Sequence, residues 1–234
     1  MKVFAISDLH ISGDNSKPMN IFGAHWDNHM EKIIDSWEKK VKQEDLVLIP
    51  GDISWAMEME QAIKELWELE TLPGKKLIIK GNHDYWWGGI GKLRNALPPS
   101  FFALQNDAWV EKEYVIAGTR GWILPGTADY QQEDEKIFNR ELLRMKMSLE
   151  KGREIAPKGK MIVMIHYPPF NEKQEDSLWT ELFQLYDVKQ VVYGHLHKQG
   201  GKTGFSGVKN GIQYYLASCD MVNFELIQLP PINF

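Results

Sequence analysis

Five short polar clusters stand along this chain, and each follows or ends a short apolar run. The clusters are Asp8-Leu9-His10, Gly51-Asp52, Gly81-Asn82-His83-Asp84, His166 and Gly194-His195-Leu196-His197. They hold five of the seven histidines. Apolar runs of this length are typical of buried strands, and open α/β sheets collect their ligands at strand ends. The pattern therefore predicts a sheet whose ends bring these clusters together.

The apolar runs and the turn residues around them predict strands at 3–6, 46–49, 77–79, 114–117, 161–165, 191–193, 213–216 and 224–229. Segments of helical period lie between the first three runs, at 30–41 and 59–69. This βαβαβ start predicts parallel strands. Asn28 and Glu31 are placed to form a capping box, which puts His29 in the first turn of its helix.

Further along, alternating charges over 134–155 predict a long amphipathic helix with a solvated face. Beyond Val191, closely spaced runs and the turns Gly200-Gly201 and Asn210-Gly211 predict a more antiparallel second half, with a hairpin at the latter turn. No long linker or repeat interrupts the chain. We therefore expect a single domain over 1–234.

Composition narrows the classes of function. The formal net charge is −5, which disfavours nucleic acid as a partner and disfavours a nuclease, because phosphate neutralisation needs clustered Lys and Arg. No apolar run reaches membrane-spanning length, and the run after Met1 is too short for a signal peptide. We expect a soluble, cytoplasmic protein without membrane contact. Cys219 is the single cysteine, so it is expected to be a small buried residue without a disulfide or a thiolate metal site.

The polar clusters carry the donor types that hold divalent metal ions. Asp8 and His10 point to one face if the strand geometry continues to them. The carboxylate of Asp52 could bridge two ions with its two oxygens. In Gly81-Asn82-His83-Asp84, the glycine, asparagine and aspartate are typical of an ordinary turn, but the histidine is not required for one. Two histidines at alternating positions, 195 and 197, directly after a strand also indicate a function. Imidazole and oxygen donors without cysteine predict a metal-dependent hydrolase.

Taken together, the clusters form the series D-x-H, G-D, G-N-H followed by D or E, a lone H, and G-H-x-H. In this the chain resembles the calcineurin-like metallophosphoesterase superfamily, most closely its bacterial phosphoesterases and phosphohydrolases. The resemblance covers 8–197 and implies an α/β fold: a four-layer α/β/β/α sandwich of two mixed β-sheets flanked by helices. The strand pattern alone is also compatible with a single doubly wound sheet.

The resemblance also implies roles for individual residues. One ion would bind to Asp8, His10, Asp52 and His197. The other would bind to Asp52, Asn82, His166 and His195. His83 would act on the substrate, by protonating the departing alkoxide or by hydrogen-bonding the phosphoryl group, and Asp84 would orient its ring.

The implied reaction is hydrolysis of a phosphate ester by a hydroxide held between two divalent or mixed-valence ions. Manganese or iron is the favoured metal, and zinc, cobalt and nickel are alternatives.

A phosphodiester is the favoured substrate, with a phosphomonoester as the alternative. Serine/threonine protein phosphatase activity is a further alternative. It is disfavoured because those enzymes extend the second motif as G-D-x-x-D-R-G, whereas this chain has Gly51-Asp52-Ile53-Ser54-Trp55. A non-catalytic protein-binding scaffold is the alternative of another class, disfavoured because every ligand position is filled.

Several residues near the motifs have two interpretations. Arg120 is either a phosphate contact or an ordinary surface arginine. The loop 11–27 either shapes the substrate entrance or carries a plain surface histidine, His25. Aromatic residues near the motifs either stack a nucleobase or pack the core; they are Trp55, Tyr85, Trp86, Trp87, Trp122 and Tyr167.

Overall fold

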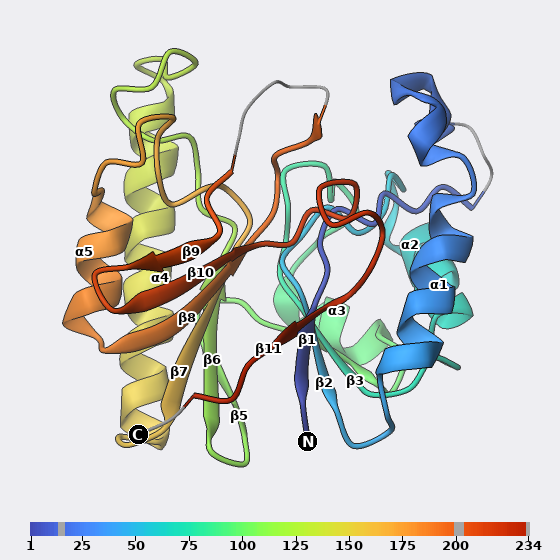
Figure 1. Ribbon diagram of the computed structural model, residues 1–234, viewed down its shortest axis with the longest axis horizontal. Helices are drawn as coiled ribbons and strands as arrows, with labels where there is room; N and C mark the ends of the chain where they lie inside the picture. The colour runs from blue at the N-terminus through green and yellow to red at the C-terminus, as the bar shows by residue number, and fades with distance from the viewer. Residues whose placement is uncertain (14–16, 199–203, 233–234) are drawn as a thin grey trace.

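Two mixed β-sheets stack face to face at the centre of the molecule (Figure 1). The computed structural model describes residues 1–13, 17–198 and 204–232. The first sheet has the order β11-β1-β2-β3-β4, with β1 (Val3–Ala5), β2 (Leu46–Ile49), β3 (Lys75–Ile78), β4 (Phe101–Ala103) and β11 (Ile227–Leu229). The second has the order β5-β6-β7-β8-β10-β9, with β5 (Ala108–Glu111), β6 (Tyr114–Thr119), β7 (Lys160–Ile165), β8 (Val188–Tyr193), β9 (Gly207–Lys209) and β10 (Ile212–Leu216).

Helices cover the outer face of each sheet (Figure 1). α1 (His29–Lys40), α2 (Met59–Glu68) and α3 (Ile90–Ala96) pack on the first sheet, and α4 (Asp134–Ile155) and α5 (Leu178–Leu185) on the second. Two short 3-10 turns, η1 (Met19–Phe22) and η2 (Ala24–Trp26), precede α1. This confirms the four-layer α/β/β/α arrangement and excludes the single doubly wound sheet.

Alternation along the strands explains why two sheets form. In β2, Val47 and Ile49 pack against the helices, whereas Leu46 and Leu48 face the second sheet. A strand that is apolar on both faces needs a covering layer on each side, because successive side chains point in opposite directions. The helices supply one cover and the other sheet supplies the second.

The strand directions correct one expectation. β6, β7, β8 and β10 are parallel, so the second half of the chain is not mainly antiparallel. The antiparallel strands β5, β9 and β11 lie at sheet edges. The predicted hairpin is confirmed as β9–β10, while Gly200-Gly201 lies outside the described residues.

Local expectations had mixed outcomes. α4 spans the predicted range and is amphipathic as expected, since it buries Phe138, Met145 and Leu149 on one face. The capping box at Asn28 is wrong, since Asn28 has a left-handed backbone (φ 55°) and its side chain caps nothing. Residues 224–226 are not a strand; β11 begins at Ile227. Cys219 is fully buried, as expected.

The short elements β4, β5, α3 and α5 were not anticipated, because their runs are brief or lack a clear period. Among the described residues, no helix is long and apolar enough to cross a lipid bilayer.

Packing between the sheets should dominate stability. Val192 is fully buried and belongs to the cluster that fills the space between the two sheets, whereas Val208 is 67% exposed. We expect Val192→Ala to lower the free energy of unfolding by about 1.5–3 kcal/mol, because it removes two buried carbons worth about 0.8 kcal/mol each and leaves a cavity. The same substitution at Val208 should change it by less than about 0.5 kcal/mol. Urea denaturation of both variants tests this, and equal effects would contradict the assigned inner face of β8.

Candidate metal centre

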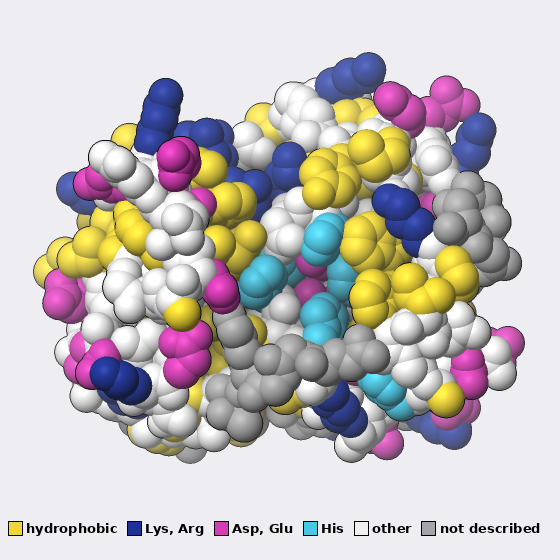
Figure 2. All heavy atoms as spheres, turned by 90° about the horizontal axis from the view of Figure 1, so that it is seen from above, with side chains coloured by type: hydrophobic (Ala, Val, Ile, Leu, Met, Phe, Trp, Pro, Cys, Tyr) yellow, Lys and Arg dark blue, Asp and Glu magenta, His cyan; other side chains and the backbone are white. Residues whose placement is uncertain are grey.

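The carboxyl ends of the parallel strands of both sheets meet at one edge of the molecule. Ser7, just after β1, joins the sheets there: its N–H donates to the Ala217 carbonyl at 2.7 Å, and its own carbonyl accepts the N–H of Cys219 at 2.9 Å. The five polar clusters therefore come from different sheets but end in the same place. Figure 2 shows their result, a group of histidines in a groove between the two halves of the molecule.

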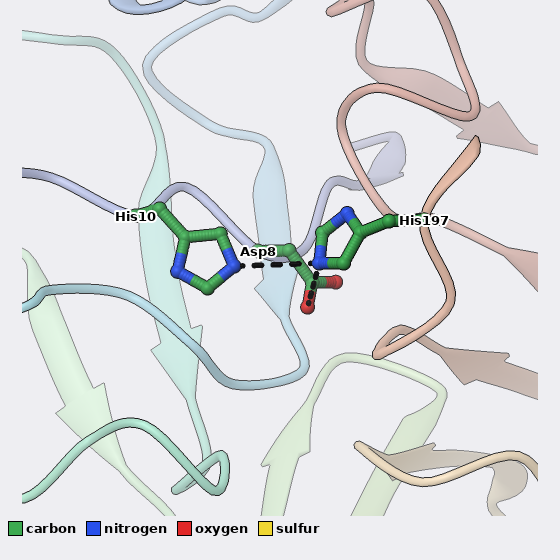
Figure 3. Close-up of side chains that lie close together, drawn as sticks. All are labelled: Asp8, His10 and His197. Carbon is green, nitrogen blue, oxygen red and sulfur yellow. Dashed lines mark hydrogen bonds and ion pairs between the residues drawn. The ribbon is translucent and has the colours of Figure 1, made fainter. Parts of the chain in front are cut away.

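One group of donors comprises Asp8, His10 and His197, whose ligand atoms all lie within 4.8 Å of one another (Figure 3). The Nε2 atoms of His10 and His197 are 3.4 Å apart, and His197 Nε2 is 3.7 Å from Asp8 Oδ1. Asp8 also accepts the backbone N–H of His195, at 3.1 and 3.2 Å from its two oxygens. The first and last motifs thus share a carboxylate across 187 residues of chain.

A second group of donors comprises Asp52, His166 and His195, again within 4.8 Å of one another. Asn82 completes it, since its Oδ1 lies 2.7 Å from His166 Nε2 and 2.9 Å from His195 Nδ1.

Asp52 reaches both groups with a single oxygen. Its Oδ2 is 3.4 Å from His166 Nε2 and 4.0 Å from His10 Nε2, while Oδ1 accepts the N–H of His83 at 2.8 Å. Burial alone would raise the pKa of Asp52, but the neighbouring His166 outweighs it and lowers that pKa below its usual range. The carboxylate is therefore ionised and faces both donor groups.

The backbone at these residues is unusual. Asp8, His10, Asp52 and His195 have φ of 59°, 47°, 51° and 71°. The expectation that strand geometry continues through Asp8 and His10 is therefore wrong, although both side chains still reach one group. Left-handed conformations cost non-glycine residues free energy, and such costs concentrate at functional sites.

Two motif glycines permit close approach of the chain. A Cβ at Gly81 would collide with the backbone and side chain of Asp52, and one at Gly194 would collide with the side chains of Ser7 and Asp8. Larger residues there would push the carboxylates out of position.

Outer hydrogen bonds orient two of the histidines. His166 Nδ1 donates to the Pro50 carbonyl at 2.9 Å, and His197 Nδ1 bonds to Asp220 Oδ1 at 2.9 Å. Each contact turns Nε2 towards the other donors, as partners of metal-binding histidines do. Asp220 was not anticipated, although it follows the strand predicted at 213–216 as the other acidic motif residues follow theirs.

The proton affinities of the histidines fit a cation site. Burial lowers the pKa of His10 to about 3, which leaves a neutral imidazole. Burial also lowers that of His166, but Asp52 outweighs it and raises the pKa to about 9. Without a metal ion, a proton on His166 Nε2 thus occupies the side that faces Asp52 and Asn82. The site therefore favours a positive charge beside Asp52, which a proton on His166 supplies here. Carboxylate, amide and imidazole donors that converge on such a place are suited to divalent metal ions.

Asp84 does not orient His83, contrary to expectation. Its buried carboxylate accepts N–H groups from Asp52, Ile53, Ser54, Gly81 and the Trp86 indole. His83 Nδ1 is buried and has no hydrogen-bond partner within the described part of the chain. Instead the ring of His83 lies against Trp55, with centroids 4.6 Å apart.

The six aromatic residues near the motifs have different surroundings. Tyr85 is exposed, and Trp122 packs on Tyr167 with ring centroids 5.0 Å apart. Trp55 stacks on His10 at 4.7 Å, and Tyr167 lies 4.1 Å from the His195 ring, so both line the donor cluster. Trp86 and Trp87 are buried in the core. Trp26 was not anticipated, but it contacts His10 and His197 from the loop 11–27. His25 from the same loop contacts Trp26 and Phe224 and belongs to neither donor group.

Comparison with known proteins identifies the family. The model of the calcineurin-like phosphoesterase domain matches residues 1–199. This chain belongs to the calcineurin-like phosphoesterases. As a member of this family, it is a hydrolase of phosphoric esters, and the family depends on metal ions.

Relatives of this phosphoesterase are distant. A probable cyclic nucleotide phosphodiesterase of Coxiella burnetii is 26% identical over 215 residues, which cover 84% of this chain and 76% of that protein. An uncharacterised protein of Methanocaldococcus jannaschii is 27% identical over 118 residues, 47% of this chain and 66% of that one. The solved structure of an archaeal phosphodiesterase is 15% identical and covers 98% of this chain and 99% of that one, with a TM-score of 0.41.

The contact between His197 and Asp220 gives a test of metal binding. In Asp220→Asn, the amide oxygen can still accept the N–H of Lys198, but the amide nitrogen then faces His197 Nδ1 and donates to it. The proton of His197 moves to Nε2, which can no longer bind a metal. We expect the affinity for manganese to fall about 10- to 100-fold, as measured by calorimetric titration.

The exposed Asp187, which pairs with Lys189, supplies the matched control, and Asp187→Asn should bind manganese like the unmodified protein. Unchanged affinity in Asp220→Asn would show that Asp220 does not hold His197 in a metal-binding orientation.

Proposed function

We propose that this protein is a phosphodiesterase with two metal ions, held in one domain spanning 1–234. One ion would be bound by Asp8, His10, Asp52 and His197. The other would be bound by Asp52, Asn82, His166 and His195. The observation that carries the proposal is the position of Asp52 Oδ2, which faces a histidine of each donor group. Manganese or iron is the proposed metal.

When bound, two such ions lower the pKa of water and neutralise charge on the phosphoryl oxygens. The protein contributes positioning. His83 is half-buried beside the donor groups, and its backbone is fixed by its bond to Asp52. Its ring is therefore placed to donate a proton or a hydrogen bond to the ester.

An apolar cavity beside the second donor group supports an ester with an organic group on it. The cavity measures about 120 Å³, and His195 and Tyr167 belong to its wall. The remaining lining includes four aromatic side chains, Trp122, Phe170, Tyr193 and Phe205, and polar ones such as Asn171 and Gln174. Such a wall suits an aromatic or apolar substituent.

A phosphodiester is favoured over a monoester on two grounds. The residues after Asp52 lack the arginine with which protein phosphatases hold a phosphate dianion, and a relative is named a probable cyclic nucleotide phosphodiesterase. A scaffold role is disfavoured because the donor residues converge into two groups instead of being dispersed.

Hydrolysis of two chromogenic esters tests the proposal. Protein loaded with manganese should hydrolyse bis(p-nitrophenyl) phosphate with a higher kcat/KM than p-nitrophenyl phosphate. Asp52→Asn should lose bound metal and activity together, because both donor groups lose their shared carboxylate, whereas Asp187→Asn should retain both. Preference for the monoester would select the alternative substrate class. Activity on neither ester would favour the scaffold.

Removal of the His83 ring separates its two roles. We expect His83→Ala to retain its metal content and to lose roughly 100- to 10,000-fold in kcat, the range of a general acid–base group. If His83 protonates the alkoxide, the loss grows as the pKa of the leaving group rises across a series of aryl and alkyl esters. An equal loss across the series would assign the ring to hydrogen bonding, and a loss of metal would place it among the ligands.

A further inference from the structure

A second cavity, of about 230 Å³, lies outside the metal centre and is rich in positive charge. It is enclosed by the residues that follow β3 and β4, the end of β6 and one side of α4. Its charged lining residues are Lys80, Arg120, Arg140, Arg144 and Glu141. Figure 2 shows dark blue Lys and Arg side chains in the groove, just above the cyan histidines in that view.

Glu141 is the centre of this cluster. Its side chain is 1% exposed, and its Oε1 lies 2.8 Å from Arg144, 3.4 Å from Arg140 and 3.6 Å from Arg120. Its Oε2 accepts the hydroxyl of Thr119 at 2.6 Å. Both carboxylate oxygens are therefore engaged, Oε1 by the arginines and Oε2 by the Thr119 hydroxyl.

The charges in the cavity do not balance. Four cationic side chains line it against the one carboxylate, in a chain whose formal net charge is −5. Like charges this close repel, and the repulsion is screened weakly when the groups are partly buried. In addition, Arg120 is only 16% exposed, and its Nε is buried without a hydrogen-bond partner in the described part of the chain.

Guanidinium groups around a cavity are suited to tetrahedral oxyanions, because each presents a planar fork of N–H donors. Thr119 and Gln105 add neutral polar groups to the same wall. We propose that this cavity binds a phosphate-class oxyanion at a site separate from the metal centre. The anion is either a free phosphate or pyrophosphate, or a further phosphate group of the substrate; the chemistry recognised is the same. The binding of a free anion does not depend on the proposed function, whereas a role for the site in binding the substrate rests on it.

The cavity is linked to the metal centre through the backbone. Lys80 lies two residues before Asn82, and the carbonyl of Arg120 accepts the N–H groups of His166 and Tyr167, both at 3.0 Å. The Arg120 guanidinium lies 4.3 Å from the Trp122 ring centroid, and its Nη2 is 3.6 Å from Glu141 Oε1. An anion held there is thus near the metal centre without being one of its ligands.

Titration of pyrophosphate into chelator-treated protein tests the site by calorimetry. We expect one binding event, weakened at least tenfold in Arg144→Met. Lys146→Met removes the same charge from the exposed side of α4 and should leave the affinity unchanged. Arg140, which is 49% exposed, provides a second variant, Arg140→Met, that removes a lining cation with less risk to folding.

Glu141→Gln distinguishes an anion site from a merely structural cluster. Removal of the one negative charge should tighten pyrophosphate binding, because the three arginines lose their competitor, while the amide oxygen can still accept from Thr119. Affinity that is unchanged in Arg140→Met and in Arg144→Met overturns the proposal. So does weaker binding in a folded Glu141→Gln variant, as judged by its thermal unfolding.

Kinetics separate the two sources of the anion. If the site takes a group of the substrate, Arg144→Met raises KM for a diester that carries an additional terminal phosphate and leaves KM for bis(p-nitrophenyl) phosphate unchanged. If it takes a free anion, pyrophosphate alters the rate with bis(p-nitrophenyl) phosphate in the unmodified protein, and not in Arg144→Met. Binding without either effect retains the site and excludes its coupling to hydrolysis.

Discussion

The buried carboxylate of Asp84 holds the first half of the metal centre together. It accepts backbone N–H groups from the loop after β2 and from the loop after β3, at distances of 2.7 to 3.3 Å. Burial, reinforced by the nearby Asp52, raises the pKa of Asp84 to about 6, so ionising this group has a cost that the N–H donors offset. In return, Asp52 and Asn82 are fixed relative to each other before any ligand binds. Asp84 was expected to orient the imidazole of His83, but it binds the backbone of two loops instead.

The second half of the centre depends on the stacking of the sheets. His166, His195 and His197 follow strands of the second sheet, and they meet Asp8 and Asp52 because parallel strands of both sheets end at the same edge. The bonds of Ser7 to Ala217 and Cys219 hold that edge closed. Within it, the left-handed turns at Asp8, His10, Asp52 and His195 redirect the side chains over short distances. The apolar core thus stabilises backbone conformations that would be unfavourable in isolation.

The sequence was most informative where the signal lies within a short stretch of chain, such as a polar cluster after an apolar run or a regular pattern of charges. The strand-end clusters correctly indicated which residues converge, and the charge pattern of 134–155 gave the bounds of α4. It was less informative where the outcome depends on tertiary contact. Neither the left-handed backbone of Asp8 nor the contact of Asp220 with His197 leaves a local pattern in the sequence. Asp8 packs closely against Gly194, and Asp220 meets His197 from another loop, so both depend on residues distant in the chain. The role of Asp84 was misjudged for the same reason: its nearest imidazole in sequence is not its partner in space.

Glu141 explains where the positively charged side chains lie at this edge of the molecule. Cation binding at a metal centre is weakened by a nearby guanidinium, because like charges repel most where water is excluded. Arg120 is close to that centre along the backbone, yet its side chain is drawn to Glu141 and Trp122 instead. The Glu141 carboxylate thereby gathers the guanidinium groups of Arg120, Arg140 and Arg144 around the neighbouring cavity. The cationic side chains and the two donor groups thus occupy separate parts of the same edge of the molecule.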